Sequence, residues 1–241
     1  MSLGLRLSST IVSIALLTFT TLGTAASALD LKETPGLAER VGKDLPPVAE
    51  RVPAEPLVVD LEAAGREIGT SGGEINTLIG RSKDVRLINV WGYARLVGYT
   101  EDLVLVPDLL KDLVSEDDRR FTLHLRKGHK WSDGAPFTSE DIRFWYEDIA
   151  LNQELQPAGL PAFMLAGGKP PVFEVIDETT VRFAWDAPNP LFAPELAKSR
   201  PPFIYRPAHY LKQFHAKYGD MDEIAELAAA RKLRNWASLF N

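Results

Sequence analysis

Residues 121–149 read FTLHLRKGHKWSDGAPFTSEDIRFWYEDI, and each landmark in this stretch has a structural use. The first residues alternate between apolar and polar, which is the period of a strand with one buried face. Asp133-Gly134 is a dipeptide typical of turns. Thr138 can then cap a helix while Asp141 reaches back to it, as in a capping box. The helix carries an apolar stripe that predicts a core-facing side, formed by Ile142, Trp145, Tyr146 and Ile149.

The histidines and carboxylates of this stretch are the residue types that metal sites and hydrolases use. His124 and His129 do not have the spacing of a HExxH motif, and the chain has no cysteine to complete a zinc site. Asp133, Glu140 and Asp141 could form a carboxylate pair for glycoside hydrolysis, but turn and cap chemistry accounts for all three. The stretch is therefore predicted to be scaffold, with no catalytic residue, no metal and no cofactor.

Composition narrows the class of protein. The chain has 241 residues, of which 45% are hydrophobic and 25% charged, as in an ordinary globular protein of one large or two small domains. The net charge is -6 without a basic cluster, which argues against nucleic acid as a partner. The absence of cysteine predicts that burial of a core, and not disulfide bonds, stabilises the fold.

The N-terminal residues have the order of a secretory signal. Arg6 precedes the apolar run IVSIALLTFTTLG, and Ala26-Ser27-Ala28 follows as a small-x-small cleavage pattern. The run is too short to span a bilayer, which needs about 20 apolar residues. Residues 1–28 are therefore predicted to be a signal peptide that is cleaved near Ala28, with an interfacial anchor helix as the alternative. A bacterial source would place the mature chain in the periplasm.

The segments that follow the signal peptide predict an extended arm and then the start of a folded region. Residues 29–56 are rich in proline and predict an extended N-terminal arm. LVVDL, from residue 57, looks like a short strand. The segment TSGGEINTL, residues 70–78, predicts a loop in which backbone can approach another molecule. The aromatics around Trp91 and Tyr93 predict either core or the lining of a pocket.

The rest of the chain alternates short strands and helices. LVLVPDLLKDLV predicts a strand, a proline break and a brief helical turn, and VFEVIDETTVRFAW predicts a hairpin. A strand is expected near Phe203, and it leads after Pro207 into a helix. A further helix is expected in DMDEIAELAAARKL, with Asp220 or Asp222 at its N-terminal end.

The segment VPDLLKDLV followed by residues 121–149 is similar to the signature segment of the family 5 extracellular solute-binding proteins. These are dipeptide, oligopeptide and nickel receptors of ATP-driven bacterial importers. The family pattern is a strand ending Leu-Arg-x-Gly, an aromatic residue, Ser-Asp-Gly-x-Pro, and a helix that opens Thr-x-Glu-Asp. The matching positions here are Leu125, Arg126, Gly128, Trp131, Ser132, Asp133, Gly134, Pro136, Thr138, Glu140, Asp141 and Ile142.

The resemblance covers residues 57–215 and implies an α/β fold of the periplasmic binding protein type II kind, a mixed-sheet lobe with an inserted α/β subdomain. Residues 57–75 and 199–241 would form the lobe that touches ligand, and residues 76–198 the inserted subdomain. Family members are longer, so the chain is expected to stop before the second lobe. The signature stretch would lie in the insertion, away from ligand.

The function implied is that of the substrate-binding component of an ABC-type importer, a monomer that is not an enzyme. It would capture peptides or similar polar solutes in the periplasm and deliver them to membrane permease subunits. The alternatives are a secreted hydrolase, or a truncated fragment without independent binding. The ligand contacts predicted in this way are Ser71, Gly72, Gly73, Glu74, Trp91 and Tyr93.

Overall fold

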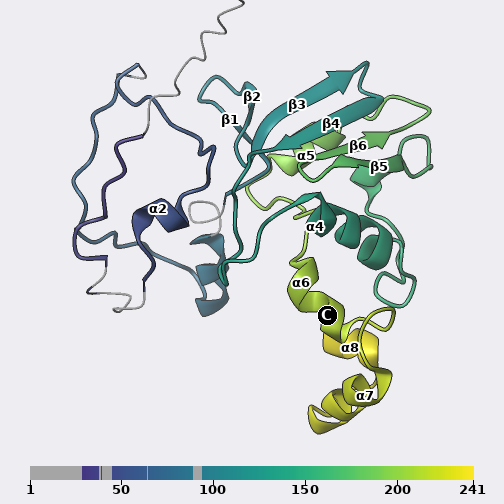
Figure 1. Ribbon diagram of the computed structural model, residues 1–241. Helices are drawn as coiled ribbons and strands as arrows, with labels where there is room; N and C mark the ends of the chain where they lie inside the picture. The colour runs from purple at the N-terminus through teal and green to yellow at the C-terminus, as the bar shows by residue number, and fades with distance from the viewer. Residues whose placement is uncertain (1–28, 38, 40–44, 64, 89–93) are drawn as a thin grey trace, which may run out of the picture. The chain divides into compact units, whose positions relative to one another are not determined.

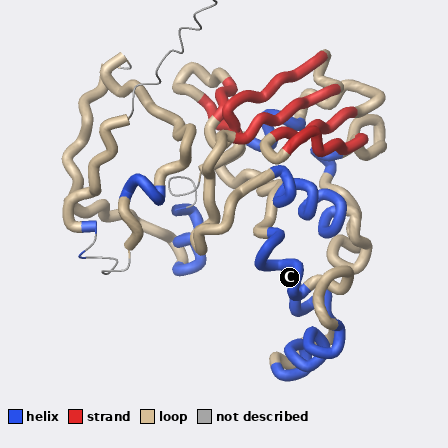
Figure 2. Tube along the Cα trace, viewed as in Figure 1, coloured by secondary structure: helices blue, strands red, loops and turns tan. Residues whose placement is uncertain are grey.

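The computed structural model describes residues 29–37, 39, 45–63, 65–88 and 94–241, and the predicted signal peptide, residues 1–28, lies outside them. The chain divides into two units, residues 1–32 and residues 33–241, and every element described below belongs to the second. Figure 1 labels these elements, and Figure 2 distinguishes helices from strands.

The described elements are short and alternate along the chain. The strands are β1 (Val97–Tyr99), β2 (Leu105–Pro107), β3 (Leu110–Glu116), β4 (Arg120–Leu125), β5 (Val172–Asp177) and β6 (Thr180–Ala184). The α-helices are α2 (Val48–Arg51), α4 (Ser139–Arg143), α5 (Phe192–Leu196), α6 (Ala208–Leu211), α7 (Met221–Ala230) and α8 (Trp236–Phe240). The 3-10 helices are η1 (Ser82–Ile88), η3 (Ala162–Met164) and η4 (Lys212–Phe214), and η2 (Phe144–Ala150) is a π-helix.

The main sheet has four strands in the order β3-β4-β6-β5, and each of its pairings is antiparallel. The alternation in residues 121–125 forms β4 as predicted, and the predicted hairpin forms β5 and β6. Phe121 lies opposite Phe183, and Leu123 lies opposite Val181, so the apolar residues of the two central strands are in register. A separate two-stranded sheet joins β1 to β2.

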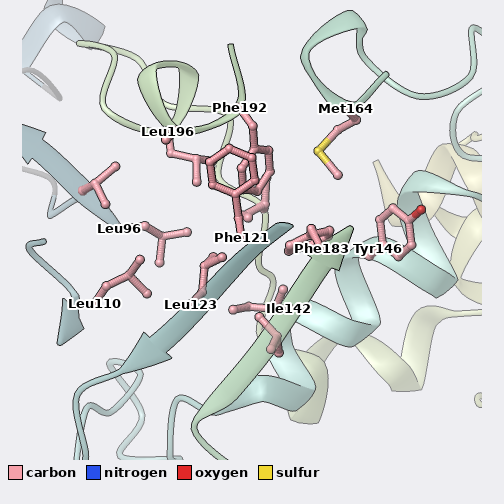
Figure 3. Close-up of a cluster of buried hydrophobic side chains, with 14 of the residues drawn as sticks. Leu96, Leu110, Phe121, Leu123, Ile142, Tyr146, Met164, Phe183, Phe192 and Leu196 are labelled. Atoms are coloured by element: carbon pink, nitrogen blue, oxygen red, sulfur yellow. The ribbon is translucent and has the colours of Figure 1, made fainter. Parts of the chain in front are cut away.

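The larger of two hydrophobic clusters lies against the central strands β4 and β6 (Figure 3). Phe121, Leu123 and Phe183 are almost wholly buried there. Phe192 and Leu196 come from α5 and cover Phe121, whose ring centroid lies 5.0 Å from that of Phe192. Burial of this apolar surface is the main favourable contribution to folding.

The helical segment formed by α4 and η2 begins as the sequence predicts. The Thr138 side chain accepts a hydrogen bond from the backbone N–H of Glu140, and an Asp141 carboxylate oxygen accepts one from the backbone N–H of Thr138 at 2.9 Å. All four residues of the predicted apolar stripe are buried, but they divide between two clusters. Ile142 faces the larger cluster, whereas Ile149 belongs to a second one beside the C-terminal helices. A helix that is buried on two sides in this way separates the two cores.

The C-terminal helices are also capped by side chains. The Asp220 carboxylate accepts hydrogen bonds from the first backbone N–H groups of α7, as predicted, and the Asn235 side chain caps α8. Ile224 and Trp236 from these two helices are buried in the second cluster with Phe144 of η2. The C-terminal segment is thereby packed against the helix that follows the signature turn.

Three predicted elements differ in the structure. Residues 57–61 form no strand, and the side chains of Leu57, Val58 and Val59 are exposed, because no other described strand pairs with this segment. Residues 201–206 have no strand either, since prolines remove backbone donors there. The segment LLKDLV, predicted as a helical turn, lies in strand β3 from Leu110 onward.

Candidate functional site

The predicted contact loop, Ser71 to Glu74, is exposed and irregular. Gly72 and Gly73 have φ values of +122° and +78°, which favour glycine, and an added Cβ would meet open space at both. No described pocket residue comes from this loop, so its role in binding stays a prediction. Trp91 and Tyr93, the other predicted contacts, lie outside the described residues.

The polar groups of the signature stretch make structural contacts. The His124 Nδ1 atom lies 3.3 Å from the Thr180 hydroxyl on the neighbouring strand. One Asp133 carboxylate oxygen accepts a hydrogen bond from the Ala135 N–H at 3.0 Å, as expected of a turn, and the other lies 2.7 Å from His209 Nε2. The His209 contact, together with this hydrogen bond, holds the pKa of Asp133 below its ordinary value. Among the residues described, no three His, Asp or Glu side chains form a group that could hold a metal ion.

Asp141 joins the signature stretch to the segment before α6. Its carboxylate accepts hydrogen bonds from the backbone N–H groups of Thr138 and Ala208, each at 2.9 Å. Its backbone carbonyl accepts one from the N–H of Arg206 at 3.1 Å. Burial raises the pKa of Asp141, and the two hydrogen bonds to its carboxylate oppose that rise. These contacts fix residues 203–207 beside the signature turn.

A cavity of about 440 Å³ lies where these two segments meet. Four of its lining residues are aromatic, and their rings pack on one another with centroids 5.1 Å to 6.1 Å apart. Its volume falls in the usual range of small-molecule sites. The described lining residues are Ala94, Leu109, His129, Lys130, Trp131, Phe137, Phe203, Tyr205, Arg206 and Pro207.

A second cavity, of about 580 Å³, shares Phe203 and Arg206 with the first. Its other described walls come from η2 and from the proline-rich loop that follows it, together with Pro201 and Pro202. Phe203 and Arg206 thus form a partition with a cavity on either side. We call the two cavities and this partition the paired cavity.

Arg206 and His129 both have unusual surroundings in the paired cavity. Arg206 is partly buried, and its Nη1 atom donates to the backbone carbonyls of Phe203 and Tyr205, at 2.8 Å each. Burial lowers the pKa of Arg206. The Nε2 atom of His129 is buried and has no hydrogen-bond partner among the described residues, and burial also lowers the pKa of His129. Buried polar atoms are normally paired, so this corner is suited to receive a polar partner.

Gly128, which precedes His129, provides a test of how the arm packs here. Gly128 and Gly134 both have positive φ, +86° and +90°. An alanine Cβ at 128 would lie 2.4 Å from the backbone nitrogen of Ala54, whereas nothing lies within 4 Å at 134. Both alanine variants should carry backbone strain of about 1 kcal/mol. Gly128→Ala should lower the free energy of unfolding by about 2 kcal/mol more than Gly134→Ala, because it also overpacks against Ala54.

Urea unfolding of the two variants beside the parent protein measures this difference. Equal losses at the two positions would show that Ala54 does not pack against Gly128.

None of the described residues that line the paired cavity was among the predicted site residues. Its aromatic walls come from two segments far apart in sequence, represented by Trp131 and Tyr205, and no local pattern joins them. The sequence held one signal for this site. Phe203, Tyr205 and Arg206 lie between prolines, outside any helix or strand into whose core-facing side they could pack.

The model of the family described as bacterial extracellular solute-binding proteins, family 5 middle, matches residues 104–229, more than half of the chain. The chain belongs to this family. The family is one of solute-binding proteins and not of catalysts, and the resemblance of residues 121–149 to its signature segment is thereby confirmed.

Similar proteins agree with this family assignment. The periplasmic alpha-galactoside-binding protein of Rhizobium meliloti (strain 1021) is 31% identical over 207 residues, which cover 74% of this chain. Among solved structures, the oligopeptide-binding protein OppA is 36% identical over 88% of this chain, with a TM-score of 0.74. The periplasmic binding protein MelB of Agrobacterium fabrum C58, solved with stachyose, is 26% identical over 83% of this chain, with a TM-score of 0.57.

These likenesses confirm the α/β fold of the periplasmic binding protein type for the family 5 chain. The chain spans 28% of the length of the alpha-galactoside-binding protein and 33% of each of the two solved chains. Within the described residues, no helix has the length and apolar character needed to cross a bilayer.

Proposed function

We propose that this protein is the substrate-binding component of an ABC-type importer that captures a polar solute in the periplasm for uptake. Family membership supports a binding role, and similar proteins carry the names oligopeptide-binding and periplasmic alpha-galactoside-binding. The solute would be a peptide or a polar molecule of similar size, such as an oligosaccharide. The partners would be that solute and the membrane permease subunits, and the receptor would act as a monomer.

The single observation that carries the proposal is the paired cavity, with its aromatic walls and its few convergent polar groups. Aromatic rings offer large apolar area and fixed geometry, and polar groups such as Arg206 then orient the ligand. The predicted contacts Ser71, Gly72, Gly73, Glu74, Trp91 and Tyr93 would extend this surface. Hinge closure around the solute would require that the solute bind the closed state more tightly than the open one.

Export and domain roles complete the proposal. Residues 1–28 would direct export and be cleaved near Ala28. Residues 57–75 and 199–241 would contribute the lobe that touches the solute, and residues 76–198 the inserted subdomain. The partition residues Phe203 and Arg206 fall in the part assigned to the ligand lobe, whereas Trp131 and other lining residues fall in the inserted subdomain. The proposal therefore departs from the expectation that the signature stretch lies away from ligand, because it gives that stretch a part in the binding surface.

Equilibrium dialysis of the purified chain against a mixed peptide pool, and separately against raffinose and stachyose, tests this function. We expect intact solute to be retained by the folded chain and not by a heat-unfolded sample. Mass spectrometry of both compartments would show any cleavage products. Turnover of the solutes would indicate a hydrolase instead, and retention of none of them would mean that the chain has no independent binding activity.

A further inference from the structure

Arg206 stands between the two halves of the paired cavity. It belongs to the segment that leads into α6, a helix labelled in Figure 1. Some of the other described arginines pair with carboxylates: Arg143 contacts Glu140 and Glu147, and Arg120 contacts Glu116. Arg119 and Arg126 instead donate to backbone carbonyls, as Arg206 does. Arg206 forms no ion pair with any residue that the structure describes, although it is more deeply placed than Arg120. Arg206 is partly buried. A cation that loses part of its hydration without gaining an anion is costly, which makes the position suited to an anionic ligand group.

The hydrogen bonds of Arg206 also orient it. Both bonds to the backbone carbonyls of Phe203 and Tyr205 use Nη1, which is one end of the planar guanidinium. Nε and Nη2 have no partner among the described residues. These two nitrogens form the edge of the guanidinium that can donate two parallel hydrogen bonds to one carboxylate. The backbone carbonyls therefore hold the group in place while its pairing edge stays available.

No acidic residue is among the described residues that line the paired cavity, although Asp108 lies near enough to act on His129 and Tyr205. The titratable residues that line the paired cavity, among those described, are His129, Lys130, Tyr205 and Arg206, and none is acidic. Lys130 is bound through its Nζ atom to the backbone carbonyl of Glu50 at 2.7 Å, so it contributes charge without being neutralised by a carboxylate. Such a lining favours a carboxylate over an amine at the partition.

We propose that Arg206 anchors a carboxylate of an elongated solute that lies across the partition, with one part in each half of the paired cavity. This proposal rests on the solute-binding function and names the chemical class of that solute. The solute carries a carboxylate and has an uncharged portion that packs on the aromatic walls. A peptide with a free C-terminus and an oligosaccharide that contains uronic acid share this chemistry.

Isothermal titration of the 241-residue chain with four probes tests whether Arg206 binds a carboxylate, and whether that carboxylate belongs to a peptide or to a uronic acid. The probes are trialanine, trialaninamide, trigalacturonate and raffinose. A hydrogen-bonded charge pair of this kind is worth about 1.5–3 kcal/mol, which is about 10- to 100-fold in Kd. We therefore expect trialanine to bind about 10-fold or more tightly than trialaninamide, or trigalacturonate to bind about 10-fold or more tightly than raffinose. The acid that shows this preference indicates whether the solute is a peptide or an acidic oligosaccharide.

Three variants test whether the guanidinium of Arg206 causes the preference for acidic probes. Arg206→Met should reduce the acid preference to near unity, and Arg206→Lys should leave a small part of it, because an ammonium cannot form the two-pronged contact. Arg120→Met removes an exposed arginine at the start of β4, which does not line the paired cavity, and should leave the preference unchanged. Thermal melts without solute show whether each variant folds, and the comparison of probes on the unaltered chain does not depend on any variant.

Each result bears on a different part of the proposal. Neutral probes that bind as tightly as the acids would overturn the anchor and leave the solute-binding function standing. An acid preference that survives in folded Arg206→Met would also overturn the anchor. Failure of all four probes, together with no retention in the dialysis experiment, would overturn the proposed function itself.

Discussion

Replacing Phe183 by alanine should lower the free energy of unfolding by about 4 kcal/mol, because it opens a cavity in the centre of the larger core. Phe183 lies on the central strand β6 and is 0% exposed. Its ring centroid lies 4.8 Å from that of Phe173, 5.3 Å from that of Phe192 and 5.6 Å from that of Tyr146. Interiors packed in this way relax only partly when a large side chain is removed.

Urea unfolding followed by circular dichroism measures this loss. Val172→Ala on the edge strand β5 is the matched control, since Val172 is 73% exposed, and it should change stability by about 0.5 kcal/mol or less. Phe183→Leu should fall between the two. A loss for Phe183→Ala no greater than that of the control would contradict the placement of Phe183 in the core.

Asp148→Asn should lower the free energy of unfolding by about 3 kcal/mol at neutral pH. The Asp148 side chain is 3% exposed, and its carboxylate lies 3.0 Å from Arg143, 2.7 Å from Lys217 and 2.8 Å from the Tyr218 hydroxyl. The loss should lie at the low end for a buried ion pair, because Lys217 is 59% exposed and stays hydrated when its partner is removed.

The pH dependence of this loss follows from the direction of the pKa shift. Burial by itself would raise the pKa of Asp148, but the hydrogen bonds from Lys217 and Tyr218 and the charge of Arg143 outweigh it and lower the pKa. A carboxyl group with a lowered pKa stabilises the folded state above its unfolded pKa of about 3.9, and this contribution is lost as the pH falls through the folded value.

Unfolding curves of the parent and Asp148→Asn at pH 7 and at pH 3 therefore test both points. The gap in stability between the two proteins should narrow at the lower pH, where the parent carboxylate begins to be protonated. Lys217→Met should lose less than Asp148→Asn, because it leaves Arg143 and Tyr218 on the carboxylate. A gap that does not change with pH would show that the charge of Asp148 is not what stabilises this contact.

The elements that the sequence predicted well are those fixed by local chemistry. The alternation of residues 121–125, the cap at Thr138 and the N-terminal Asp220 of α7 each depend on a few neighbouring residues. Leu57 and its neighbours gave a false strand, because a strand also needs a partner and local propensity does not supply one.

Strand β3 shows how a local irregularity can imitate another structure. Leu110 pairs with Leu125 and Asp112 with His124, so a bulge at Lys111 breaks the alternation. After the bulge, Leu113 lies opposite Leu123. The two inward-facing leucines are then three positions apart, which is helical spacing and so imitates the predicted helical turn.

The candidate site was less predictable than the fold because it forms only through tertiary contacts. Trp131 lies at a turn and Tyr205 in an irregular segment. Their ring centroids lie 6.1 Å apart where Asp141 joins the two segments. That Arg206 forms no ion pair with a described residue depends on what surrounds it in space. Sequence spacing alone therefore could not distinguish it from a surface arginine.

The strand order β3-β4-β6-β5 has a consequence for the order in which the protein folds. The pairs β3-β4 and β5-β6 are local hairpins that can form within microseconds, but β4 must wait for β6, which is made much later along the chain. The loop between them contains the α4–η2 helix, and closing it requires non-local contacts that slow folding. Before Phe183 emerges from the ribosome, the nascent chain would therefore expose the apolar face of β4. A chaperone that recognises exposed apolar surface would bind the chain at this stage.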